Sequence, residues 1–278
     1  MKPIDVKLSS YMHQWGVHSV PFIECTGQPL FETEQTTRAL ELLQQSAALR
    51  SVMLLSGDNG TGKSTLAAHW IGTLDPKAYR PLVITQSSLS ASGVLCSLLA
   101  RLGAQPSLHR AACLGRMEES LCRLGSVTPV IILDEAQNYA PSAIEEVRLL
   151  LGLNLPDKPA FALILIGDTY LLDTLRMQSR RALFTRIAVS FQLQALRTPQ
   201  VDAYLQHGMR LAGVDRPCFE TTAIEMIAAA AEGIPRTINL LARAAWLEAS
   251  RLKLNTIQAG HVQSALQHIP VAKEKISR

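Results

Sequence analysis

The sequence predicts an α/β fold in which a five-stranded parallel sheet, covered by helices, is followed by a small helical domain. Five short apolar runs bounded by turn residues alternate with helical patterns, an order that favours a parallel sheet. A glycine-rich loop follows the first run, and strand-like runs stop after about Arg197. The expected strands are 52–56, 82–85, 130–133, 162–166 and 187–193.

The loop after the first expected strand has the pattern of a phosphate-binding loop. Residues 57–64 fit G-x-x-x-x-G-K-[ST], and a helical pattern follows over 65–73. Glycines permit positive φ, so backbone N–H groups can converge on phosphate oxygens at a helix N-terminus. We expect Lys63 to reach the β- and γ-phosphates of ATP and Ser64 to ligate Mg²⁺. The expected nucleotide-binding residues are Gly57, Asp58, Asn59, Gly60, Thr61, Gly62, Lys63, Ser64 and Thr65.

Two carboxylates, Asp134 and Glu135, come directly after the third expected strand. Open α/β sheets bind ligands at the carboxyl ends of their strands. Asp134 is expected to bind Mg²⁺ through water, and Glu135 to orient or deprotonate the water that attacks the γ-phosphate. A solvated strand end is the alternative, and the phosphate loop favours the catalytic interpretation.

Length and composition set the limits for these motifs. The 278 residues carry a formal net charge of +4, a mild basicity that permits binding to nucleic acid without demonstrating it. No apolar run approaches the length of a membrane span, and the N-terminus has no signal-peptide pattern. The five cysteines are scattered without metal-site spacing and are expected to be reduced thiols of a cytoplasmic protein.

The expected domains are a nucleotide-binding core over 1–197, a helical lid over 198–270 and a charged tail over 271–278. The core includes an irregular, aromatic-containing leader. A helix is expected before the loop, over 36–46, and the lid is expected to contain helices over 199–212, 221–232, 235–252 and 256–268.

The chain resembles the AAA+ ATPases in further segments. Residues 182–187 look like the segment that carries an arginine finger, which would be Arg186. Residues 233–236, Gly-Ile-Pro-Arg, look like the sensor-2 motif that opens a lid helix. The resemblance implies that Arg186 stabilises transition-state charge on a neighbouring subunit's nucleotide and that Arg236 faces a bound phosphate.

Sensor 1 of that family corresponds to Asp168, which ends the fourth expected strand in the segment 166–168, Ile-Gly-Asp. Similar proteins often carry Gln, Asn or Thr at this place. An acidic residue can position water, but it repels the γ-phosphate unless Mg²⁺ or an arginine neutralises it.

Within the AAA+ proteins the chain is similar to the ExeA/TniB group over nearly its whole length. Three segments carry the similarity, namely 15–22, 133–137 and 233–241. The resemblance implies that Trp15 and Phe22 in the leader lie near the adenine, and docking onto the protein core is the alternative.

Several arginine assignments have alternatives. Arg186 is also compatible with a packing or surface arginine, and Arg180 and Arg181 are nearby candidates for the trans-acting role or for contacts to phosphate backbones. For Arg236 the alternative is a solvent-facing side chain.

No base-reading motif identifies a DNA site in this sequence. The candidates are Ser87 and Ser88, in a polar loop after the second expected strand, with Arg110 and Arg116 further on. Hydroxyl and backbone N–H contacts there would bind phosphates without reading sequence. An ordinary surface loop is the alternative.

The motifs predict an ATPase that assembles with ATP into a homo-oligomeric ring or helical filament. The resemblance to the transposition helpers TniB, TnsC and MuB implies nonspecific binding to duplex DNA and recruitment or activation of a transposase. A secretion ATPase similar to ExeA is the first alternative, disfavoured by the lack of a membrane span and of an appended cell-wall-binding module. A nucleotide-regulated scaffold with negligible hydrolysis is the second.

Overall fold

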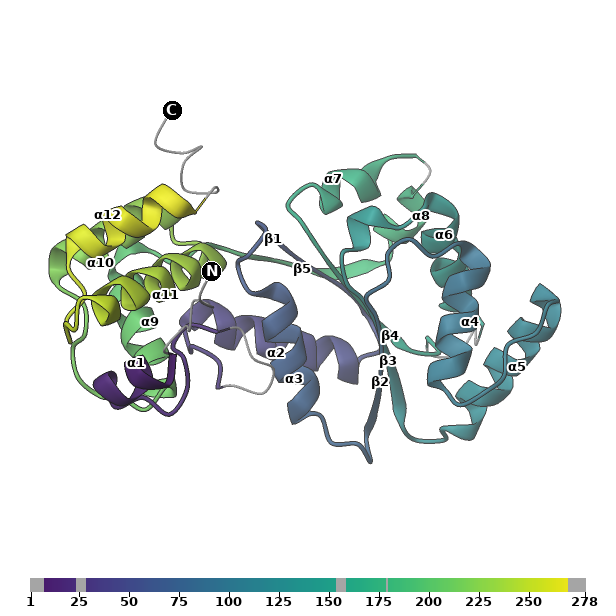
Figure 1. Cartoon of the computed structure of the whole chain (residues 1–278). Coiled ribbons are helices and arrows are strands. Elements are labelled where there is room, and N and C mark those ends of the chain that lie inside the picture. Colours follow the sequence, from purple (N-terminus) through teal and green to yellow (C-terminus); the bar gives the residue numbers. More distant parts are fainter. Residues whose placement is uncertain (1–7, 24–28, 154–158, 179, 270–278) are drawn as a thin grey trace, which may run out of the picture. The chain divides into compact units, whose positions relative to one another are not determined.

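Five parallel strands form one sheet (Figure 1), which confirms the sheet predicted from the alternating apolar runs. The strands are β1 (Val52–Gly57), β2 (Tyr79–Ile84), β3 (Thr128–Leu133), β4 (Ala162–Gly167) and β5 (Ile187–Leu193). Their order across the sheet is β2-β3-β4-β1-β5, and each neighbouring pair is parallel. This order makes β3, β4 and β1 neighbours, so the segments that follow them emerge side by side at one edge.

Strand β2 begins at Tyr79, earlier than the expected residue 82, because Tyr79–Pro81 continue the ladder with β3 although they are less buried. Pro81 has no N–H to donate, and it is tolerated because β2 is an edge strand.

The computed structural model describes residues 8–23, 29–153, 159–178 and 180–269 of the chain. By its internal contacts the chain divides into two units. The helical unit contains residues up to Phe31, the loop segment Asn59–Gly62 and the chain from Gln194 onward. The sheet unit contains Glu32–Asp58 and Lys63–Leu193.

In the sheet unit, helices cover both faces of the sheet (Figure 1). Helices α2 (Glu34–Ala48) and α3 (Lys63–Thr73) lie on one face, where the predicted core residue Trp70 is buried and donates to Gln44 Oε1 at 3.1 Å. The remaining helices of the unit cover the opposite face or connect its strands: α4 (Ala91–Arg101), α5 (Arg110–Arg123), the 3₁₀ turn η1 (Ala136–Asn138), α6 (Pro141–Leu150), α7 (Leu171–Arg176) and α8 (Arg181–Phe184).

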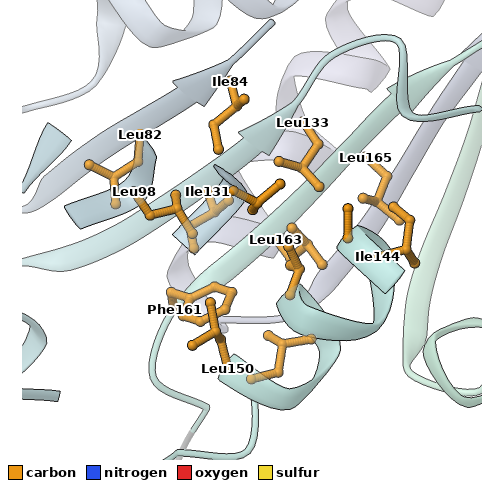
Figure 2. Close-up of a cluster of buried hydrophobic side chains, with 14 of the residues drawn as sticks. Leu82, Ile84, Leu98, Ile131, Leu133, Ile144, Leu150, Phe161, Leu163 and Leu165 are labelled. Atoms are coloured by element: carbon orange, nitrogen blue, oxygen red, sulfur yellow. The ribbon is translucent and has the colours of Figure 1, made fainter. Parts of the chain in front are cut away.

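The central strands β1, β3 and β4 bury both of their faces, which explains why they are continuous apolar runs, whereas β5 alternates between half-buried and exposed residues. In β1, every residue is buried, so Leu54 packs in the core on the α4–α8 face while its neighbours Met53 and Leu55 point to the other face. Figure 2 shows the same face, with strand residues such as Ile131 and Leu163 packed near side chains of α4 and α6. Truncating one such leucine to alanine would destabilise the unit by about 2–5 kcal/mol.

The helical unit consists of α1 (Leu8–Trp15), α9 (Thr198–Leu211), α10 (Thr221–Ala231), α11 (Pro235–Arg251) and α12 (Ala259–His268) around a second apolar core. The last four helices were expected from the sequence. Trp246, an expected core residue, is fully buried on α11.

The leader differs from the irregular segment that the sequence predicts, because residues 8–15 form helix α1. Trp15 is buried, its ring lies 6.3 Å from that of Trp246, and its Nε1 donates to Ser250 Oγ at 2.8 Å. Tertiary packing on α11 therefore stabilises a helix too short to form alone. The leader was expected within the core domain 1–197, and its described residues pack instead in the helical unit. The expected tail 271–278 lies outside the described residues.

Candidate active site

The phosphate-binding loop joins β1 to helix α3. Gly60 and Gly62 have φ values of +89° and +97°, in a region where L side chains are strained, so the motif glycines supply the conformation that the turn requires. Helix α3 begins at Lys63. The loop therefore places a helix N-terminus, with its unpaired N–H groups, directly after the glycine-rich turn.

Lys63 is buried, and its Nζ donates to the carbonyl oxygens of Gly57 at 2.8 Å and Asp58 at 2.9 Å. An ammonium group carries three N–H donors, so one is left for a ligand oxygen. Burial lowers the pKa of Lys63, and the negative charges of Glu135, Asp134, Asp168 and Asp58 oppose this lowering. The lysine is thus a desolvated cation whose charge is supported by the surrounding carboxylates.

Asp134 and Glu135 follow β3 at the edge where the loop follows β1. The backbone N–H of Asp134 donates to Ile84 O at 3.0 Å, and its Oδ1 accepts from the N–H of Glu135 at 2.9 Å. Glu135 has φ 52° and ψ 44°, a left-handed conformation that is uncommon for a residue with a side chain. Both carboxylates are half-buried. The turn that ends β3 therefore fixes the backbone positions of the two acids.

Asp168 follows β4, the strand between β3 and β1. Its Oδ1 accepts from the N–H of Tyr170 at 3.0 Å, and its own N–H donates to Gln137 Oε1 at 3.3 Å. Gln137 has no expected role in the sequence, yet its Nε2 also donates to Glu135 Oε2 at 2.6 Å. The sequence signal for Gln137 was its place in the segment 133–137, which carries part of the resemblance to the ExeA/TniB group.

The donor set fits a magnesium ion better than a softer metal. Ser64 is exposed in the first turn of α3, and Asp134 is half-buried at the end of β3, so both expected ligands are hard oxygen donors. Among the residues that the structure describes, no group of three or more His, Cys, Asp or Glu side chains is placed to hold a metal.

In the helical unit, the loop segment Asn59–Gly62 contacts the start of α11. The backbone N–H of Arg236 donates to Gly60 O at 3.2 Å. The turn before α11 is held by Gly233, whose φ is +72° and whose added Cβ would lie 1.9 Å from Leu196 O. The expected sensor-2 arginine therefore opens its helix at the tip of the phosphate loop.

The three arginines considered for a trans-acting role differ in their surroundings. Arg180 Nη2 donates to Tyr139 O at 2.8 Å, and burial lowers the pKa of its guanidinium. Arg186 is half-buried, and its Nη1 donates to Arg148 O at 3.2 Å. Arg181 is exposed at the start of α8, and within the described residues its side chain makes no hydrogen bond.

The aromatic leader residues dock on the helical unit. Phe22 is buried in its apolar core, where its ring lies 5.9 Å from that of Phe219. An added Cβ on Gly208 would lie 2.3 Å from the Phe22 ring, so the absence of a side chain there makes room for it. Like Trp15, Phe22 therefore has a packing role, which corresponds to the docking alternative.

The DNA-binding candidates lie on different elements. Ser87 and Ser88 form a turn between β2 and α4, while Arg110 and Arg116 lie on α5. Arg110 forms an ion pair with Glu146, whose side chain is only 5% exposed, and Arg116 Nη1 donates to Gln105 O at 2.6 Å. Both guanidinium groups thus have structural contacts within the chain, and their binding of phosphate stays a prediction.

The five-stranded parallel sheet, the glycine-rich loop between β1 and α3 and the helices that follow β5 confirm the predicted fold class. Residues 47–175 match a family described as an AAA domain. The chain is 29% identical over 267 residues to General secretion pathway protein A of Aeromonas hydrophila, an alignment that covers 93% of this chain and 48% of that protein. The chain therefore spans about half the length of this relative.

Two solved structures show the same fold at low sequence identity. The ORC2 protein of Aeropyrum pernix matches with a TM-score of 0.70 and 16% identity over 89% of this chain and 70% of that one. Cdc6p of Pyrobaculum aerophilum matches with a TM-score of 0.71 and 17% identity over 88% and 70%. Across the described part of the chain, no helix is both long and apolar enough to cross a membrane.

Proposed function

We propose that this chain is an ATPase that binds ATP and Mg²⁺ on the loop 57–65 and hydrolyses the γ-phosphate bond. The observation that supports it most strongly is the shared position of one buried cation and several carboxylates. Lys63 interacts electrostatically with Glu135, Asp134 and Asp168 at the carboxyl ends of adjacent strands. Ligands of open α/β sheets bind at this edge.

In this proposal each side chain has one role. Ser64 and Asp134 hold the magnesium ion, which would neutralise developing charge on the phosphate oxygens. Lys63 donates its remaining N–H to a phosphate oxygen, Glu135 accepts a proton from the attacking water, and Asp168 orients that water. An excess of carboxylates over cations at this edge makes hydrolysis dependent on the divalent ion.

Two variants test the proposal. Lys63→Ala should weaken ATP binding because the loop loses its cation, and Glu135→Gln should bind ATP but hydrolyse it roughly 10²- to 10⁴-fold more slowly because the proton acceptor is gone. ATP binding is measured with a fluorescent analogue and hydrolysis by phosphate release. Hydrolysis by Glu135→Gln at the parental rate would refute the catalytic assignment, and normal binding by Lys63→Ala would refute the loop assignment.

We further propose that Arg181 acts on the nucleotide of a neighbouring subunit. Its guanidinium is exposed and makes no hydrogen bond within the described ranges of the chain, which supports this choice over Arg186. Arg186 was expected from the sequence, and it donates within its own subunit. Arg181→Ala should bind ATP yet lose hydrolysis. Mixed with Glu135→Gln subunits it should regain activity, because a hybrid interface pairs an intact Glu135 with an intact arginine. If mixing with Glu135→Gln subunits rescues Arg186→Ala but not Arg181→Ala, then Arg186 is the trans-acting arginine and the proposal for Arg181 is wrong.

The cellular use of the ATP cycle has two candidates. The sequence motifs and mild positive charge support a DNA-transposition helper that binds duplex DNA as an ATP-assembled oligomer and recruits or activates a transposase. The chain is 29% identical to a secretion-pathway protein in an alignment that covers 93% of this chain, and this similarity supports a role in secretion. The comparisons favour the secretion role, and the fold is compatible with either.

Fluorescence anisotropy on unrelated DNA duplexes separates the two roles. The transposition proposal expects binding that needs ATP or a nonhydrolysable analogue, varies little with sequence and falls steeply with salt, because an oligomer sums many phosphate contacts. Absence of ATP-dependent binding at low salt would leave the secretion role. Equally tight binding without nucleotide would retain DNA as a partner and refute ATP-driven assembly.

A further inference from the structure

Gln137 connects two segments of the candidate active site through both ends of its side-chain amide. Its Nε2 donates to Glu135 Oε2 at 2.6 Å, and its Oε1 accepts from the backbone N–H of Asp168 at 3.3 Å. Glu135 and Gln137 lie in the turn after β3, and Asp168 follows β4, the adjacent strand. The amide thus bridges the carboxyl ends of neighbouring strands.

The space for this amide exists because residue 167 is a glycine. A Cβ added to Gly167 would lie 2.5 Å from Gln137 Oε1 and 2.5 Å from Leu171 Cδ2. The φ of Gly167 lies outside the left-handed region, so backbone conformation does not require glycine there. Room for the Gln137 amide and for Leu171 is therefore the steric reason for the missing side chain.

We infer that Gln137 is a positioning residue that holds the Glu135 carboxylate for proton transfer; this inference rests on the proposed ATPase function. One carboxylate oxygen, Oε2, is fixed by the amide. Glu135 Oε1 has no hydrogen-bond partner within the described part of the chain, so it is the oxygen available to a water molecule. Without the amide, the carboxylate samples several rotamers on an already strained backbone.

The bridge also explains how β4 would influence the base. The Asp168 N–H orients Gln137 Oε1, and this orientation turns Nε2 toward Glu135. A shift of the backbone at Asp168 would therefore change the position of the carboxylate, although within the described residues Asp168 itself makes no hydrogen bond with Glu135. Gln137 is in this sense the link between the sensor-1 position and the base.

The primary test compares Gln137→Leu and Gln137→Glu with the parent. Leucine removes both hydrogen bonds, whereas glutamate keeps an acceptor for the Asp168 N–H and removes the donor to Glu135. Both variants should lower kcat by up to about 100-fold, because misplacement of a reacting group by about an ångström has an effect of that size. The Kd for a fluorescent ATP analogue should stay at the parental value. Asn138→Ala, an exposed neighbour in the same turn, is the matched control and should leave kcat unchanged.

A double-mutant cycle identifies the route of the effect. If Gln137 acts through Glu135, then Gln137→Leu should slow the parent but should not slow Glu135→Gln further. A full additional loss in the Glu135→Gln background would show that Gln137 acts independently of Glu135 and would overturn the inference. A parallel rise in the Kd for ATP would indicate general damage to the site and would also overturn it.

Failure of the inference and failure of the proposed function give different results. No ATP hydrolysis by the folded parent, tested over a range of protein concentrations, would refute the function. Hydrolysis that is lost in Glu135→Gln but unchanged in Gln137→Leu and Gln137→Glu would refute only the role of Gln137. Thermal unfolding of each variant excludes misfolding, and Gln137→Glu serves if Gln137→Leu does not fold.

Discussion

The contact between the phosphate loop and the start of α11 makes a quantitative prediction for two glycines of the same loop. An alanine Cβ at Gly60 would lie 2.9 Å from Arg236 Cβ and 3.0 Å from Ile234 Cγ2. At Gly62 an added Cβ has no heavy atom within 4 Å. Both glycines have positive φ, so Gly62→Ala is a matched control that introduces backbone strain without a steric contact.

The two substitutions should therefore differ in the free energy of unfolding. Placing an alanine in a left-handed conformation destabilises by about 1–2 kcal/mol, which is the expected effect of Gly62→Ala. Gly60→Ala adds overpacking against the start of α11, which is worth about 1–3 kcal/mol. The total for Gly60→Ala is thus roughly 2–5 kcal/mol.

Urea unfolding without nucleotide, followed by tryptophan fluorescence, measures this difference. Trp15 and Trp246 report on the helical unit, to which the loop tip belongs. If Gly60→Ala lowers the free energy of unfolding more than Gly62→Ala does, the packing of the loop tip on Arg236 and Ile234 is confirmed. Equal losses would refute it, because only the backbone strain that both substitutions share would then be detected.

Three further predictions follow from contacts of buried groups. Ser250→Ala should destabilise the protein by about 1–3 kcal/mol in urea unfolding, because it leaves the indole N–H of Trp15 without its acceptor, and an unchanged midpoint would contradict the docking of the leader. Burial raises the pKa of Tyr139 from the ordinary value of 10.0 to about 12, so the protonated phenol contributes stability that is present below pH 10.0 and is lost as the pH rises through 12. In a titration followed by phenolate absorbance, the step at the highest pH should be missing in Tyr139→Phe. Arg110→Ala should leave Glu146 unpaired and destabilise the protein by roughly 1–3 kcal/mol, which is less than for a fully buried pair because Arg110 is half exposed. Weaker DNA binding at unchanged stability would instead favour a phosphate-binding role for Arg110.

Local features of the sequence were sufficient for the sheet, the loop and the lid helices. The apolar runs, the motif glycines and the 3.6-residue periodicity each act over a few neighbouring residues, so they can be read without knowing the rest of the fold. Helix α1 was missed because its stability comes from Trp15 packing on α11, far away in sequence. The leader's membership of the helical unit has the same origin.

The sequence by itself determined which groups carry the proposed chemistry, namely Lys63, Ser64, Asp134 and Glu135, because a loop motif and a strand end define them locally. Tertiary structure decided their partners. The strand order sets Asp168 between the other two strand ends and lets Gln137 bridge to Glu135, and the fold commits Arg186 to a carbonyl while Arg181 stays exposed. The hydrogen bonds from the Asp168 N–H to Gln137 and from Arg186 to Arg148 O join residues far apart in the chain. Their geometry depends on how strands and helices pack, which no local pattern specifies.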